Sequence, residues 1–266
     1  MSALGYAVTD SMTMLRRNLR RMQRYPSMTA ILVAMPLVLL LLFVYVFGGT
    51  LGAGIGGPAI GSGGRAAYVE YVLPGIILLA LTSTAQGVAI TVAMDMSEGI
   101  IARFRTMAIS RAAVLTGHVV GSVIQALLAV AVVLGVGVLI GFRPDATPVE
   151  WLGVLGLLTL VALALTWLSV ALGMISKSVE SASNIPMPLM LLPFFGSGFV
   201  PTDSLPTGLR WFAEYQPFTP IIETLRGLLS GAPIGTSGYL AAAWCVGITL
   251  VGYLWARTSY QRLPNR

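Results

Sequence analysis

DMSEGIIARFRTMAISR, residues 95–111, is a short charged segment between two long apolar runs. Residues 71–94 before it and residues 116–140 after it contain no Asp, Glu, Lys or Arg. Each run is longer than the roughly 20 residues with which an α-helix crosses a bilayer. The charged segment is therefore predicted to be a tight loop at one face of a membrane.

A helix within this loop is amphipathic, with apolar side chains on one side and arginines elsewhere. Such a helix lies on the membrane surface. Two interpretations stay open: a solvated loop that follows the positive charge bias of cytoplasmic faces, or a docking element for a soluble partner. The apolar set is Ile100, Ile101, Phe104, Met107 and Ile109, and the arginines are Arg103, Arg105 and Arg111.

The composition is that of an integral membrane protein. Of its 266 residues, 56% are hydrophobic and 10% are charged, against about 25% charged in soluble domains. One membrane domain, residues 1–266, is predicted. The net charge of +6 does not indicate nucleic-acid binding, because the basic residues stand beside apolar runs and not on one water-facing patch. Cys245 is the only cysteine, which excludes a disulfide or a thiolate metal site within one chain.

The apolar runs predict an all-α integral membrane fold with six transmembrane helices. The fifth run contains Pro186, Pro188 and Pro193, so we expect it to lie in the protein interior, where neighbours satisfy the carbonyls that proline frees. Residues 201–235 are too polar to cross and are predicted to form two short re-entrant amphipathic helices in the outer leaflet. The predicted spans are residues 28–47, 71–94, 116–140, 151–175, 182–198 and 239–255.

An interfacial elbow helix over residues 8–25 is predicted before the first span, because apolar residues recur there at helical spacing. Its arginines admit a second interpretation, as an orientation signal only. Six crossings place both termini on one side, and 12 of the 16 basic residues lie on that side. The positive-inside rule therefore makes both termini cytoplasmic. The elbow arginines are Arg16, Arg17, Arg20, Arg21 and Arg24.

The chemistry of an enzyme is not evident in this chain. The spans contain no charged residue, although ion-coupled transporters generally need intramembrane ionisable groups or broken-helix ion sites. His118 suits an interfacial position, with a proton relay as the alternative. No glycine-rich loop ends in Lys followed by Ser or Thr, so the chain does not bind ATP by a phosphate loop. Active transport would need energy from another chain.

Polar uncharged side chains are dense in the second span and continue in the third. Helix packing is one explanation, and a substrate-facing wall is the other. The polar residues are Thr82, Ser83, Thr84, Gln86 and Thr91, then Ser122 and Gln125. The pathway residues predicted from these spans and from the fifth are Ser83, Gln86, Gln125, Phe194 and Phe195.

The chain resembles the membrane subunit of type-2 ABC exporters, especially the bacterial daunorubicin/doxorubicin resistance permease group. The likeness covers nearly the whole length and rests on three motifs. These are the basic elbow, the loop EGIIARFRTMAISR (residues 98–111), and Gln216-Pro217-Phe218 leading to Leu225-Arg226-Gly227-Leu228. One departure is Met107-Ala108, where the family loop commonly has a proline after the basic pair.

The resemblance implies a homodimeric permease in a bacterial plasma membrane, with two cytoplasmic ATPase subunits that bind ATP and Mg. It implies export of hydrophobic or amphipathic drug-like compounds; export of lipid or glycan, or a passive channel or scaffold, are the alternatives. The elbow arginines and a coupling set would contact the ATPase. The coupling set is Glu98, Gly99, Arg103, Phe104, Arg105 and Arg111, and the extracellular gate segment is Pro217, Glu223 and Arg226.

Overall fold

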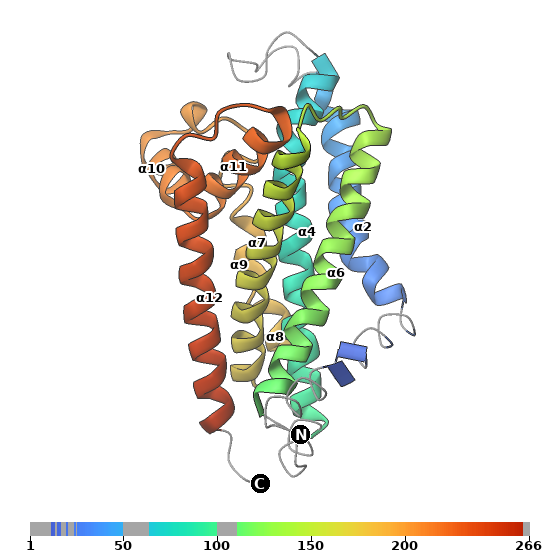
Figure 1. The fold of residues 1–266 in the computed structure, drawn as a ribbon, viewed down its shortest axis with the longest axis vertical. Coiled ribbons are helices and arrows are strands. Elements are labelled where there is room, and N and C mark those ends of the chain that lie inside the picture. The colour runs from blue at the N-terminus through green and yellow to red at the C-terminus, as the bar shows by residue number, and fades with distance from the viewer. Residues whose placement is uncertain are drawn as a thin grey trace.

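The computed structural model describes residues 26–49, 64–99 and 111–262, together with positions 12, 13, 15, 16, 20 and 24. Within these ranges the chain is helical and contains no strand. The long helices run along one axis of the molecule (Figure 1). Those helices are α2 (Pro26–Leu42), continued by the π-helical η1 (Phe43–Phe47), then α4 (Gly64–Ser97), α6 (Arg111–Leu139), α7 (Pro148–Ile175) and α12 (Ser237–Arg262).

Five helices in the described ranges are long and apolar enough to cross a membrane. They coincide with five of the six predicted spans, which confirms a multi-pass all-helical membrane protein. In Figure 1, α4 and α12 end and α6 begins at the lower end, whereas α7 and α12 begin at the upper end. We use "lower end" and "upper end" in this sense below.

Helix α4 is longer than the predicted span, because it begins at Gly64 and not at Tyr71. Its first turn packs on η1, where the Arg65 guanidinium lies 5.1 Å from the centre of the Tyr45 ring. A cation over an aromatic face is stabilising, and this contact lies in the part of α4 that precedes the predicted span. Asp95 likewise lies in the last turns of α4, where it is buried.

Helix α4 is the centre of the bundle, in contact with α2, α6, α7 and α11. Its approach to α7 is close because Gly173 of α7 has no side chain there. A Cβ atom at Gly173 would lie 2.6 Å from the carbonyl oxygen of Ala89. Small residues allow membrane helices to approach in this way.

Helix α7 begins with a capping box, in which Thr147 and Glu150 each bond the backbone N–H of the other.

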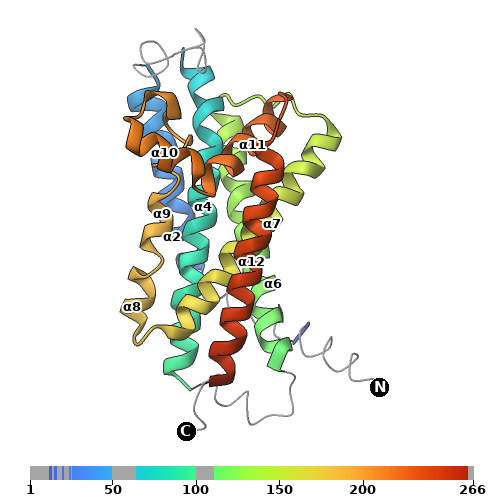
Figure 2. The same ribbon diagram turned by 90° about the vertical axis from the view of Figure 1, so that its left-hand side faces the viewer.

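The prediction of one helix over residues 182–198 is wrong. The chain instead forms α8 (Val179–Asn184), α9 (Met187–Leu191) and an irregular stretch over residues 192–200. Pro186 and Pro188 cannot donate the backbone hydrogen bonds that would join α8 to α9. This broken segment, residues 179–200, runs along one side of α4 from the lower toward the upper end (Figure 2). It is not wholly interior either, because Met187 and Leu191 are exposed.

The two short amphipathic helices expected after residue 200 are present at the upper end. Helix α10 (Thr207–Tyr215) follows a 3-10 turn, η2 (Thr202–Ser204), and exposes Trp211 and Tyr215. Helix α11 (Phe218–Ser230) is buried along most of its length and contacts α4, α7 and α12. At the upper end, α11 therefore packs between the spanning helices α4, α7 and α12.

Candidate functional site

Three of the six predicted coupling residues are described, and they lie at the lower end. Glu98 and Gly99 form the turn after α4, and Gly99 has φ +70°, the left-handed region that favours glycine. Arg111 begins α6. Arg103, Phe104 and Arg105 lie outside the described residues. Their docking role therefore stays a prediction.

Only part of the predicted elbow falls within the described residues. Arg16, Arg20 and Arg24 are helical and exposed, whereas Arg17 and Arg21 lie outside. Exposed arginines are compatible with an interfacial helix. Their contact with an ATPase stays a prediction.

The polar residues of α4 are mostly bonded within their own helix. The hydroxyl of Thr82 donates to the Leu79 carbonyl at 2.9 Å, and that of Thr84 donates to the Leu81 carbonyl at 2.8 Å. Both threonines are buried. These contacts favour the helix-packing interpretation for the threonines. Ser83 is also buried, and its hydroxyl meets no hydrogen-bond partner in the described part of the chain.

Gln86 joins α4 to the broken segment. Its Nε2 donates to the Ser183 carbonyl at 2.6 Å, next to the break between α8 and α9. A carbonyl at a helix break needs a donor from elsewhere when water is excluded. Gln86 therefore stabilises the break, whatever else it does.

The other predicted pathway residues lie on different elements. Gln125 is half-buried on α6. Phe194 and Phe195 are 38% and 42% exposed on the irregular stretch. Phe194 stacks on Phe199 at 4.6 Å between ring centres, and Phe195 meets Phe212 edge-on at 6.4 Å. The structure thus brings the two phenylalanines to one exposed aromatic patch, apart from Ser83 inside the bundle.

Arg226 joins three elements at the upper end. Its Nη2 donates to the Ser197 carbonyl at 2.7 Å and to the Tyr71 carbonyl at 3.1 Å. Its Nη1 pairs with Glu223 one turn earlier in α11 at 2.8 Å, and its guanidinium lies 4.0 Å from the centre of the Tyr71 ring. Pro217 immediately precedes α11. Of the predicted gate residues, Glu223 and Arg226 therefore form one ion pair on α11.

Gln216 makes a parallel contact just before α11. The side chain is buried, and its Nε2 donates to the Leu192 carbonyl at 2.9 Å. Leu192 and Ser197 belong to the same irregular stretch, so α11 and the residue before it hold that stretch at two points. We call this arrangement the α11 clasp; it consists of the Gln216 and Arg226 side chains and the carbonyls of Tyr71, Leu192 and Ser197.

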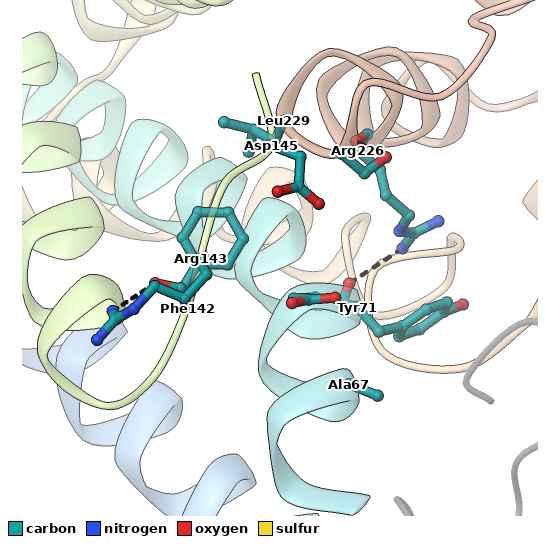
Figure 3. A pocket seen from close by; sticks show the side chains of 9 residues that line it. Ala67, Tyr71, Phe142, Arg143, Asp145, Arg226 and Leu229 are labelled. Carbon is teal, nitrogen blue, oxygen red and sulfur yellow. Dashed lines mark hydrogen bonds between the residues drawn. The ribbon is translucent and has the colours of Figure 1, made fainter. Parts of the chain in front are cut away.

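A cavity of about 210 Å³ lies beside the α11 clasp. Figure 3 shows the Asp145 carboxylate near its centre, Arg226 reaching the Tyr71 carbonyl, and Arg143 turned toward the carbonyl of Phe142. It is lined by Ala67, Glu70 and Tyr71 of α4, by Phe142, Arg143 and Asp145 of the α6–α7 connection, and by Arg226, Leu229 and Ser230 of α11.

Of the charged side chains that line this cavity, the arginines have hydrogen-bond partners and the two carboxylates have no ion-pair partner among the described residues. Arg143 donates to the Val138 carbonyl at 2.7 Å and so caps the end of α6. Neither Glu70 nor Asp145 forms an ion pair with any described residue, and the two carboxylates repel one another. Among the described residues, no group of three or more His, Cys, Asp or Glu side chains that could hold a metal ion is present, here or elsewhere.

Sequence reasoning missed Tyr71, Ser197 and Gln216 as members of the clasp. Tyr71 and Ser197 contribute carbonyls, which every residue has, so no side-chain pattern could identify them. Gln216 stands in the motif Gln216-Pro217-Phe218, but its acceptor is the Leu192 carbonyl, 24 residues earlier, which the sequence does not mark.

Comparison with known proteins agrees with this architecture. The model of the ABC-2 type transporter family matches residues 9–229. The daunorubicin resistance ABC transporter permease protein of Streptomyces coeruleorubidus is 27% identical over 93% of this chain and 82% of its own length. Probable doxorubicin resistance ABC transporter permease proteins of two Mycobacterium tuberculosis strains are 25% identical over 72% of this chain and 69% of theirs. The chain is therefore a multi-pass membrane permease that belongs to the ABC-2 type transporter family.

Proposed function

We propose that two copies of this chain form the pathway of an ATP-driven exporter, with ATP and Mg bound by separate ATPase subunits. The observation that carries the proposal is the family match over residues 9–229, which includes four of the five long apolar helices. The absence of a phosphate loop from the sequence agrees with an ATPase on another chain.

The broken segment serves as a sixth crossing in this proposal. It begins just after α7 at the lower end and leads to α10 at the upper end (Figure 2). Backbone that is irregular at membrane depth is tolerated where protein or a water-filled cavity surrounds it. A sixth crossing puts both termini on the cytoplasmic side, in agreement with the excess of basic residues there.

One apolar side of the molecule suits contact with a second copy. Ile31, Met35 and Val38 of α2 are exposed, as are Phe194 and Phe195 of the broken segment. Both elements pack on α4, and Figure 2 shows them toward the same side. Two copies joined through this side would place the aromatic patch at the pathway between them.

The ATPase would dock at the lower end, where α4 ends at Ser97 and α6 begins at Arg111. In the proposal, ATP-driven closure of the two ATPase subunits pushes on the loop between these helices. Because α4 contacts the broken segment, movement of α4 is transmitted to the pathway. Glu98 and the loop arginines are the contacts to test.

Hydrophobic or amphipathic drug-like compounds are the proposed cargo. Two observations support this choice: the relatives are named for daunorubicin and doxorubicin resistance, and the six spans predicted from the sequence contain no Asp, Glu, Lys or Arg. A charged cargo would need partners in the hydrocarbon region.

The test is reconstitution with the ABC ATPase subunit that co-purifies with this chain. Inside-out proteoliposomes should accumulate daunorubicin only with ATP, and an ATPase whose phosphate-loop lysine is replaced should abolish accumulation. Uptake that needs no ATPase would contradict the proposal and favour a passive channel. If a fluorescent phospholipid stimulates ATP hydrolysis and daunorubicin does not, the cargo is lipid.

A further inference from the structure

The lower half of the broken segment rests on α4. Helices α8 and α9 both have α4 as their main neighbour, and no other described helix packs on either of them to a comparable extent. Both lie beside α4 in Figure 2. The stretch after α9, by contrast, is held at two points by Gln216 and Arg226. A displacement of α4 therefore acts first on α8 and α9.

The connection to α7 does not fix the position of α8. Residues 176–178 lie between the two helices, outside regular helix, and the backbone is extended at Ser176 and Ser178. Helix α8 then starts with its own cap, because the Ser178 hydroxyl accepts from the Ser181 backbone N–H at 3.1 Å. A helix of six residues is not stable alone. The place of α8 therefore depends on its contact with α4.

Gln86 provides a directional bond in this contact. Its Nε2 donates to the Ser183 carbonyl at 2.6 Å, across 97 residues of chain, and both residues are half-buried. Apolar packing alone is non-directional, so helices held only by it can slide along one another. A hydrogen bond fixes one donor against one acceptor. Gln86 therefore sets the register of α8 against α4.

The threonine hydroxyls near Gln86 on α4 do not make such a bond. Thr82 and Thr84 donate to carbonyls of α4, as does Thr91, whose hydroxyl lies 2.8 Å from the Gly87 carbonyl. A threonine that bonds back to its own helix cannot hold a neighbouring helix through the same hydrogen. Of these four polar side chains, only Gln86 donates to another element. Thr91, which is also half-buried, is therefore a matched control.

We propose that Gln86 is a positioning residue, which makes the lower half of the broken segment follow α4 during transport. Helix α4 ends at Ser97, about three turns after Gln86, beside the loop where the ATPase would dock. When the ATPase subunits move this end, the bond to Ser183 carries α8 with it. The inference rests on the proposed export function. It assigns to Gln86 a role in coupling, in place of the cargo contact expected from the sequence.

The first experiment measures coupling in proteoliposomes that contain the complete complex. Gln86→Leu should lower the number of daunorubicin molecules transported per ATP hydrolysed by about 3- to 20-fold, the range for one hydrogen bond between membrane helices. The KM for daunorubicin should not change, because cargo does not touch Gln86. Gln86→Met has a similar length without a donor; it should behave alike, and it decides the result if Gln86→Leu does not fold. Thr91→Val should leave the transport ratio unchanged.

The second experiment measures the movement itself. Spin labels at Ser97→Cys and Glu180→Cys, which are exposed positions at the end of α4 and on α8, report the distance between these helices. The chain also carries Cys245→Ser, and dilution with unlabelled chain keeps both labels in one copy. ATP with vanadate should leave this distance unchanged when Gln86 is present and should shift it in Gln86→Leu. A shift in the parent, or none in Gln86→Leu, would overturn the coupling role.

The results separate this inference from the export proposal. If the natural complex transports daunorubicin with ATP and both Gln86 variants transport as much per ATP, the coupling role is refuted and export stands. A higher KM in these variants with an unchanged transport ratio would make Gln86 a cargo contact, which also refutes coupling. If ATP drives no transport by the natural complex, the export proposal fails and the coupling role fails with it.

Discussion

Substitution of Gly173 by alanine should separate α4 from α7. A Cβ atom at this position would lie 2.6 Å from the Ala89 carbonyl oxygen and 3.0 Å from the Cβ of Val92, whereas ordinary contact begins at 3.4 Å. The nearest atom belongs to the backbone of another helix. It cannot rotate away as a flexible side chain would, so the helices must move apart.

The expected cost follows from two opposing effects. Overpacking of a close contact destabilises by about 1–3 kcal/mol. Replacement of a helical glycine by alanine stabilises the helix by up to about 1 kcal/mol, because alanine has the higher helix propensity. The net change against the natural chain is therefore small to moderate, and a control with the same gain in helix propensity is needed to isolate the clash.

Gly156 on the same helix provides that control, because a Cβ atom there would meet no described atom within 4 Å. The two variants share the propensity gain, so Gly173→Ala should be less stable than Gly156→Ala by roughly 1–3 kcal/mol. The assay is unfolding of the purified full chain by SDS in mixed micelles, followed by tryptophan fluorescence. Equal free energies of unfolding for the two variants would refute the close contact between α4 and α7.

Three further predictions concern a helix break, a helix cap and the docking loop. Gln86→Leu should lower the free energy of unfolding by about 0.5–2 kcal/mol, because the Ser183 carbonyl loses its donor; Gln86→Glu at a pH where it is ionised should do no better, since a carboxylate cannot donate. Thr147→Ala should lower the free energy of unfolding by about 1 kcal/mol through loss of the α7 cap. Thr147→Ser keeps a hydroxyl that can cap the helix, so in the same SDS titration its free energy of unfolding should stay close to that of the natural chain. Replacement of Glu98 and Arg103 together by glutamine should abolish co-purification with the ATPase; a double variant that still binds and stimulates the ATPase would show that docking lies elsewhere.

The spanning helices were predictable because hydropathy is a local property of the chain. The runs that became α2, α6, α7 and α12 are long and free of charge in their centres, and a lipid-embedded backbone must bond within its own helix. The periodicity of α10 and α11 was equally visible, since apolar residues recur at helical spacing. The start of α4 at Gly64 was not predictable, because a charged residue such as Arg65 does not indicate a membrane helix until its contact with Tyr45 is known.

The candidate site was only partly predictable. The resemblance to type-2 ABC exporters named Glu223 and Arg226, and their spacing of three residues is compatible with the ion pair that they form. It did not reveal what Arg226 holds, because its carbonyl acceptors lie 155 and 29 residues away along the chain. A carbonyl carries no mark in a sequence, so such partners appear only once the chain is folded.

By itself, the sequence determined that this chain is helical, that it crosses a membrane several times and that its basic residues stand beside the apolar runs, since length, apolarity and charge suffice for each. Only the tertiary structure decided what the apolar residues 182–198 become. Their prolines interrupt the helix, but the sequence does not show which neighbours satisfy the irregular backbone that results. Here Gln86, Gln216 and Arg226 donate to the carbonyls of Ser183, Leu192 and Ser197. These bonds stabilise the broken segment because a carbonyl in a medium without water must be paired.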